Sequence, residues 1–298
     1  MTLQFINLKE KLVLLSLTAL LAAGCNNGNK KDNDEIPPVD STQSTILNVN
    51  GEIFSIPSPI QTAFLIKSTG AKYDKTILNP ANKSASYSTG FSKGVNLGIY
   101  GADLGYVTIY DQNQDAIGYL NSAKKLADEL GVAGAFDAKT IERFQKNLGK
   151  QDSMLVLVGD AYRSSDTYLK NNDRNDVSGL VLAGGWIESL YFATNVYKTK
   201  NTEDVKRRIA EQKSSLQSLI KLLKQYYSQP EYTEFVDNLE DLSTVYDGIE
   251  LKYTYQKPSI DPSNKMTVIN SKSEIKITPE QIESITQKIK NIRTQVVG

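Results

Sequence analysis

Two acidic residues stand out because each lies in the middle of a largely apolar segment that is predicted to be helical. Asp103 belongs to the segment 85–110, and Glu188 belongs to the segment 177–197. If the two helices cross at this level, both carboxylates face one cavity, where burial and mutual repulsion raise the pKa of one of them. Such a pair could perform general acid–base catalysis, or it could bind a cation through oxygen ligands.

Polar and aromatic neighbours extend this candidate ligand or cation site to Asn96, Tyr100 and Trp186. The aromatic rings could stack on a sugar, although tyrosines more often pack where helices cross. The plainer interpretation is a structural pair of acids, neutralised by tyrosine hydroxyls or by an arginine such as Arg163 or Arg174. We favour it because buried acids are usually paired.

The composition excludes several kinds of catalytic site. The chain contains no histidine and only one cysteine. Ser-His-Asp and Cys-His catalysis, His-ligated zinc and histidine-containing di-iron centres are therefore excluded, and no disulfide can form within the chain. Glycine-rich phosphate loops are also absent. We predict no catalytic residue, no metal and no cofactor; a hydrolase that cleaves glycans with two carboxylates is the alternative.

Glycines form a stripe along the first of the two apolar segments. At 3.6 residues per turn they fall within an arc of about 80°, and they are Gly90, Gly94, Gly98, Gly101 and Gly105. Each glycine destabilises a helix interior by about 1 kcal/mol relative to alanine. We therefore expect them to let another helix backbone approach closely, and Gly184 and Gly185 are the counterparts in the second segment.

The two apolar segments also share a short sequence pattern. A shift of 86 residues aligns five pairs: Gly98 with Gly184, Tyr100 with Trp186, Leu104 with Leu190, Tyr106 with Phe192, and Thr108 with Thr194. This pattern predicts a two-copy internal duplication, about 85–170 and 171–247, with the glycine-bearing helices side by side at a pseudo-two-fold axis. A chance match over so few residues is the alternative.

The whole pattern predicts a mainly α fold, a multi-helix bundle or array. Helical periodicity and capping signals place helices at 58–70, 85–110, 114–130, 137–148, 152–169, 177–197, 203–227 and from Pro230 to Tyr246. The segment 249–277 alternates in hydrophobicity and predicts a small β-hairpin-like extension. Thr278 and Pro279 then open a terminal amphipathic helix, 279–297, with Gln281 completing a capping box.

The N-terminus has the layout of a cleaved export signal. Lys9 and Lys11 precede an apolar run, Leu12–Ala23, which is shorter than the roughly 20 residues needed to cross a bilayer. Residues Leu21–Cys25 resemble the lipobox of bacterial lipoproteins. That resemblance implies removal of the signal peptide 1–24, diacylglycerol on Cys25 and acylation of the new amino terminus. An ordinary secretory signal is the alternative; two or more acyl chains would anchor the protein stably.

A polar tether, 25–45, follows and leads to a single domain, 46–298. Its charge run, Lys30–Glu35, resembles the surface-export signal of Bacteroidota-type lipoproteins, although it could also be a solvated linker. The tracts 96–104 and 184–188 resemble uncharacterised helical lipoproteins of the same group, which brings no activity with it.

We therefore expect an outer-membrane lipoprotein whose body binds an envelope protein or a small ligand such as a glycan. Which face of the membrane it occupies is open, with a lean towards the cell surface. A purely structural envelope component is a further alternative. Nucleic acid is not an expected partner, because 34 basic residues balance 34 acidic ones.

Overall fold

The computed structural model describes residues 45–49, 52–56, 59–132, 138–172, 174–261, 263 and 266–298. The described residues belong to one unit of the chain, 37–298. The predicted signal peptide, the lipidation site Cys25 and the charge run Lys30–Glu35 lie outside the described residues.

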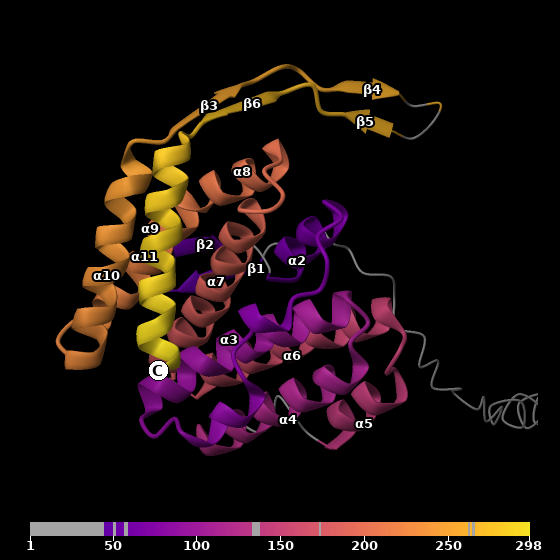
Figure 1. The fold of residues 1–298 in the computed structure, drawn as a ribbon, viewed down its shortest axis with the longest axis vertical. Coiled ribbons are helices and arrows are strands. Elements are labelled where there is room, and N and C mark those ends of the chain that lie inside the picture. The colour runs from indigo at the N-terminus through magenta and orange to yellow at the C-terminus, as the bar shows by residue number, and fades with distance from the viewer. Residues whose placement is uncertain are drawn as a thin grey trace, which may run out of the picture. The chain divides into compact units, whose positions relative to one another are not determined.

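Helices dominate the described chain, as the sequence predicts (Figure 1). They are α2 (Pro59–Ser68), α3 (Gly90–Ile109), α4 (Asn113–Glu129), α5 (Ala138–Lys146), α6 (Gln151–Asn171), α7 (Asn175–Tyr197), α8 (Glu203–Ala210), α9 (Gln212–Leu223), α10 (Pro230–Asp247) and α11 (Pro279–Val297). Short 3₁₀ turns lie at η1 (Lys75–Ile77), η2 (Ala81–Ala85) and η4 (Lys224–Tyr226). None of the described helices has both the length and the apolar character required to cross a membrane.

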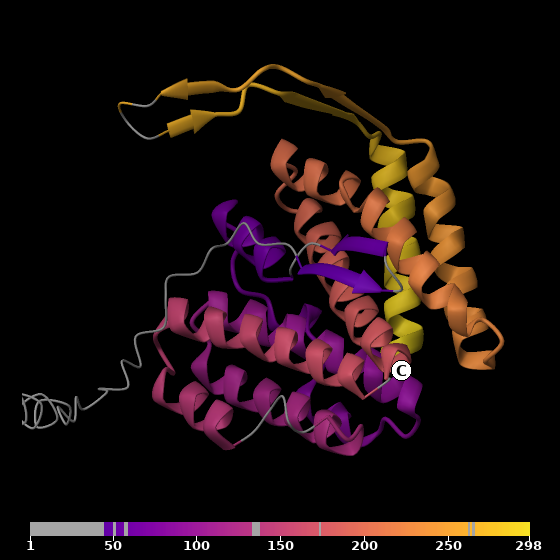
Figure 2. The same cartoon turned by 180° about the vertical axis from the view of Figure 1, so that it is seen from behind.

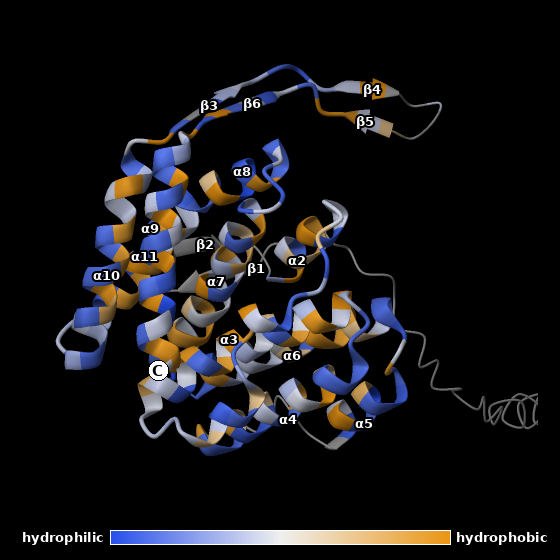
Figure 3. Cartoon of the chain, in the orientation of Figure 1, coloured by the Kyte–Doolittle hydropathy of each residue, from blue (hydrophilic) through white to orange (hydrophobic). Residues whose placement is uncertain are grey.

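Helices α3 and α7 form the centre of the bundle. Both are mostly buried, and hydrophobic residues lie on several sides of each (Figure 3). A helix that is apolar all round must be covered all round. Accordingly, α3 also contacts α2, α4 and α6, while α7 also contacts α2, α6, α8, α9 and α11.

Local signals explain where several helices begin and end. Thr89 and Thr278 each accept a hydrogen bond from a backbone N–H of the first turn and complete a capping box. After α4, Gly131 adopts a φ of 74°, in the left-handed region that glycine enters without steric cost. The predicted stop at Gly131 and the predicted start at Thr278 are confirmed.

Two predicted helices differ from the structure in their extent, and one hairpin was not predicted. The helix expected at 85–110 starts only at Gly90, because residues 81–85 form the 3₁₀ turn η2. The helix expected at 203–227 is divided at Glu211 into α8 and α9 and ends in the turn η4. A hairpin of β1 (Thr45–Val49) and β2 (Glu52–Ile56) was not predicted.

The predicted β extension is confirmed as a two-stranded antiparallel arm. Near the body, β3 (Glu250–Thr254) pairs with β6 (Lys272–Lys276). Farther out, β4 (Ser259–Asp261) pairs with β5 (Met266–Val268). Both views show the arm leading away from the adjoining ends of α10 and α11 (Figures 1 and 2).

Candidate functional site

The two central helices touch backbone to backbone at a pair of glycines. A Cβ atom added to Gly98 would lie 1.9 Å from the carbonyl oxygen of Val181, and one added to Gly184 would lie 1.9 Å from that of Val95. The contacts are reciprocal, because each glycine meets the residue three positions before the other glycine. Positions that the predicted duplication makes equivalent therefore lie together, while the duplication itself stays a prediction.

Helices α3 and α7 run in the same direction with a register offset close to the 86 residues of the sequence match. Near the start of α3, Gly94 lies against Leu180 of α7. A Cβ atom added to Gly94 would lie 3.1 Å from the Cβ of Leu180. Farther along, the rings of Tyr106 and Phe192 lie 4.8 Å apart. This alignment brings residue 103 to the level of residue 188.

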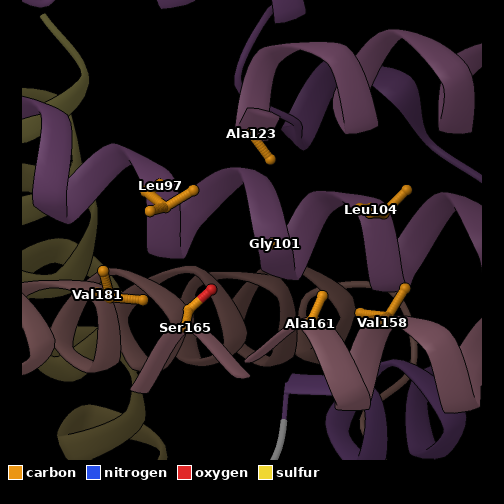
Figure 4. Close-up of a pocket in the computed structure, with 8 residues that line it drawn as sticks. All are labelled: Leu97, Gly101, Leu104, Ala123, Val158, Ala161, Ser165 and Val181. Atoms are coloured by element: carbon orange, nitrogen blue, oxygen red, sulfur yellow. The ribbon is translucent and has the colours of Figure 1, made fainter. Parts of the chain in front are cut away.

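The remaining three glycines of α3 do not contact α7 closely, so the five glycines do not form one packing face. Gly105 lies against Ile60 of α2. Gly101 lines a small cavity between α3, α4, α6 and α7 (Figure 4). Gly90 is the first residue of α3 and has no atom near the position of a Cβ, so the expectation of a packing role for it is wrong.

Glu188 is fully buried and is held by an arginine from the C-terminal helix. The Nε and Nη2 atoms of Arg293 donate to the two carboxylate oxygens of Glu188 at 2.5 and 2.7 Å. Nη2 also donates to the Ile77 carbonyl oxygen at 3.0 Å, and the guanidinium lies 4.3 Å from the centre of the Tyr191 ring. A bidentate arginine–carboxylate pair of this kind is strong and directional.

The arginines proposed from the sequence do not neutralise these acids. Arg163 pairs with Asp160 on its own helix. Arg174 lies 3.6 Å from Asp176 at the start of α7. Both of these pairs are partly exposed. The partner of Glu188 is instead Arg293, which belongs to a helix more than 100 residues farther along the chain.

Asp103 lies beside this pair and differs from Glu188 in having no cation of its own. Its Oδ2 accepts a hydrogen bond from the backbone N–H of Asn79 at 3.3 Å, whereas its buried Oδ1 accepts none from the described residues. Burial, followed by the charge of Glu188, raises the pKa of Asp103 well above its usual range, although Arg293 opposes the shift. Arg293 balances one carboxylate charge, so a proton retained by Asp103 would leave Asp103, Glu188 and Arg293 neutral together.

A network of amides and tyrosines surrounds the acids. The side-chain nitrogen of Asn79 donates to Tyr87 at 2.9 Å and to the Asn96 oxygen at 3.1 Å. Asn96 in turn donates to the Val296 carbonyl oxygen at 2.7 Å, and Tyr100 donates to the Pro80 carbonyl oxygen at 2.9 Å. These bonds join α3 to the loop before it and to the end of α11.

Every residue of the candidate ligand site is sealed from solvent. The exposed fraction is 0% for Asn96, Tyr100, Asp103 and Glu188, and 1% for Trp186. The cavity in Figure 4 includes none of these five and has a volume of about 20 Å³, room for one water-sized sphere between mostly apolar side chains. Among the described residues, no three acidic, cysteine or histidine side chains gather as a metal site would require.

Sequence reasoning missed the two residues that organise this cluster. Arg293 lies four residues after Ile289 and three before Val296, on the apolar stripe of α11, so an arginine on a buried face was a usable signal. Asn79 precedes Pro80 and reads as an ordinary loop residue. Nothing in its sequence context indicates that its backbone reaches Asp103.

Comparisons of the chain with models of protein families, with curated proteins and with solved structures gave no match.

Proposed function

We propose that the protein is an outer-membrane lipoprotein, anchored through acyl chains on Cys25, and that its helical body binds an envelope partner without catalysing a reaction. The sequence Leu21–Cys25 supports the anchor. The charge run Lys30–Glu35 supports exposure on the cell surface.

The observation that carries the non-catalytic part is the closure of the Asp103–Glu188 pair. A glycosidase must place its acid and its nucleophile or base on either side of a sugar that enters from solvent. Both carboxylates are instead fully buried, and Arg293 occupies both oxygens of Glu188. The cluster serves to fasten α11 and the loop around Asn79 to the central helices.

Cell fractionation with Cys25→Ser tests the anchor. We expect the variant to leave the membrane fraction and to lose incorporation of labelled fatty acid, because no other cysteine can carry the diacylglycerol. Thr18→Ser, a mild change inside the apolar run, is the matched control and should stay membrane-bound. Retention of Cys25→Ser in the membrane fraction would refute the proposal.

Protease treatment of intact cells tests the orientation. An exposed body is cleaved without breaking the outer membrane, and replacing the acidic residues of the charge run by Asn and Gln should protect it. Equal protection of both forms would place the body on the periplasmic side.

The double variant Asp103→Asn with Glu188→Gln tests the absence of catalysis. Because the pair is structural in this proposal, we expect any glycan-dependent growth phenotype to follow the amount of folded protein. A lost phenotype at unchanged protein level would support the hydrolase instead.

A further inference from the structure

The β arm is the part of the described chain that exposes apolar side chains. Six of the nine large apolar side chains that are exposed belong to it, with exposed fractions from 44 to 75%: Tyr253, Tyr255, Ile260, Met266, Val268 and Ile269. Monomeric proteins rarely leave such a group together in water. A two-stranded ribbon is also marginally stable alone, so this arm has the properties of an element that another chain covers.

The two faces of the inner ribbon differ sharply. In the β3–β6 register Glu250 is opposite Lys276, Lys252 is opposite Glu274, and Thr254 is opposite Lys272, so one face is charged. The alternate positions place Tyr253 and Tyr255 on the same face as Ile275. Ile275 and Ile277 line a recess of about 200 Å³ towards α8, so this apolar face is turned to the body at its base.

Only the base of this apolar face lies against α8, and its outer part around Tyr253 and Tyr255 is exposed. The open edges of the ribbon offer a further contact. The sheet has only the strands β3 and β6, so the outer edge of each presents unpaired backbone groups within the described residues. Such an edge accepts an additional antiparallel strand.

The edge of β6 is complementary in charge to itself in two registers. When two copies pair antiparallel about residue 273, Lys272 of each meets Glu274 of the other, and Ile269 meets Ile277. Moving the centre by one residue, to 274, places Lys272 opposite Lys276 and Glu274 opposite itself, so like charges disfavour it. Moving it to 275 pairs Glu274 with Lys276, but it also draws Thr278, the N-cap of α11, into the strand pairing, so we favour the centre at 273.

We propose that a second copy of this chain pairs with β6 about residue 273, which joins the two ribbons into one four-stranded sheet. The two-fold symmetry makes the interface isologous, so each substitution acts twice. Dimerisation does not depend on the acyl anchor. It is therefore tested on the full chain carrying Cys25→Ser, in the absence of detergent.

Sedimentation velocity with charge reversals decides the register. We expect the parent chain to dimerise, and Lys272→Glu to weaken the dimer about tenfold or more, because two opposite-charge pairs become like-charge pairs. Glu274→Lys does the same, but it also faces Lys252 in its own ribbon. The equimolar mixture of the two variants restores opposite charges across the interface, so it should form a heterodimer with nearly the parent affinity.

Lys276→Glu is the control, since it makes the same charge change on the same face of β6, although it also places a glutamate opposite Glu250 in its own ribbon. It should leave association unchanged, because residue 276 meets Asn270 in the proposed register. Three results would overturn the proposal: a parent chain that stays monomeric at its highest soluble concentration, a mixture that fails to associate, or a monomer whose arm binds vesicles of phosphatidylethanolamine and phosphatidylglycerol.

Discussion

Two regions of the molecule treat apolar surface in opposite ways. The crossing of α3 with α7 at Gly98 and Gly184 buries it, and the β arm exposes it. At the crossing, the backbones touch, and the buried Glu188 carboxylate is paired with Arg293. Along the arm, apolar side chains stand in solvent on a ribbon only two strands wide. The comparison teaches that the acids with the most suggestive sequence context are sealed from solvent, while most of the exposed large apolar side chains lie in a segment that shows little chemistry.

The largest effect should follow from adding a methyl group at the crossing. Gly98→Ala or Gly184→Ala places a Cβ 1.9 Å from a backbone oxygen, so the helices must separate. We expect a loss of about 3 kcal/mol or more in the free energy of unfolding, at or above the upper end for overpacked cores. Urea denaturation measures it.

Gly118→Ala is the control for the glycine substitutions. An added Cβ there lies 3.8 Å from Ala81, so helix propensity alone should act and stabilise by up to about 1 kcal/mol. Similar losses for Gly98→Ala and Gly118→Ala would contradict the close helix contact.

The next effect concerns the ion pair. Arg293→Met leaves the Glu188 carboxylate buried without its cation, and breaking such a pair costs about 3–5 kcal/mol. Adding Glu188→Gln should recover part of this loss, so the double variant is more stable than the sum of the single effects predicts. Lys288→Met on the same helix breaks the partly exposed pair with Asp241 and should cost under about 1 kcal/mol.

A smaller effect concerns the proton on Asp103. Its pKa is raised in the folded protein, so the folded state binds the proton more tightly than the unfolded chain, whose aspartate titrates near pH 3.9. This contribution to stability is complete below that pH and is lost as pH rises through the folded pKa, by at most about 1.4 kcal/mol per pH unit.

Asp103→Asn mimics the protonated acid and removes this dependence. The stability of the variant relative to the parent should therefore rise from about pH 4 up to the folded pKa of Asp103. Denaturant titrations across that range measure the difference. A relative stability that falls with pH would mean that Asp103 is ionised in the folded protein.

Much of the fold could be predicted from the sequence because local signals coincide with tertiary burial. The capping box at Thr278 and the apolar stripe of α11 both determine a helix that the structure contains. The β1–β2 hairpin was missed although Asn50-Gly51 between two alternating runs is a strong hairpin signal. The hairpin follows directly on the predicted tether, whose polar composition favours coil.

The candidate site was predicted only in part. The 86-residue match indicated that Glu188 lies beside Ser189, the equivalent of Asp103, because parallel helices in register bring equivalent positions together. The sequence could not show that Arg293 closes the space between Asp103 and Glu188, since that depends on where α11 packs. Degree of burial is a property of the assembled helices, and local periodicity does not determine it.

Hydrogen exchange of the full chain, followed by mass spectrometry, compares the two regions directly. Amides of α3 and α7 around Gly98 and Gly184 should exchange only through global unfolding and be the slowest in the protein. Amides on the open edge of β6 should exchange fast in the monomer and slow down on association. Equally fast exchange at the α3–α7 crossing and in the arm would contradict a sealed core.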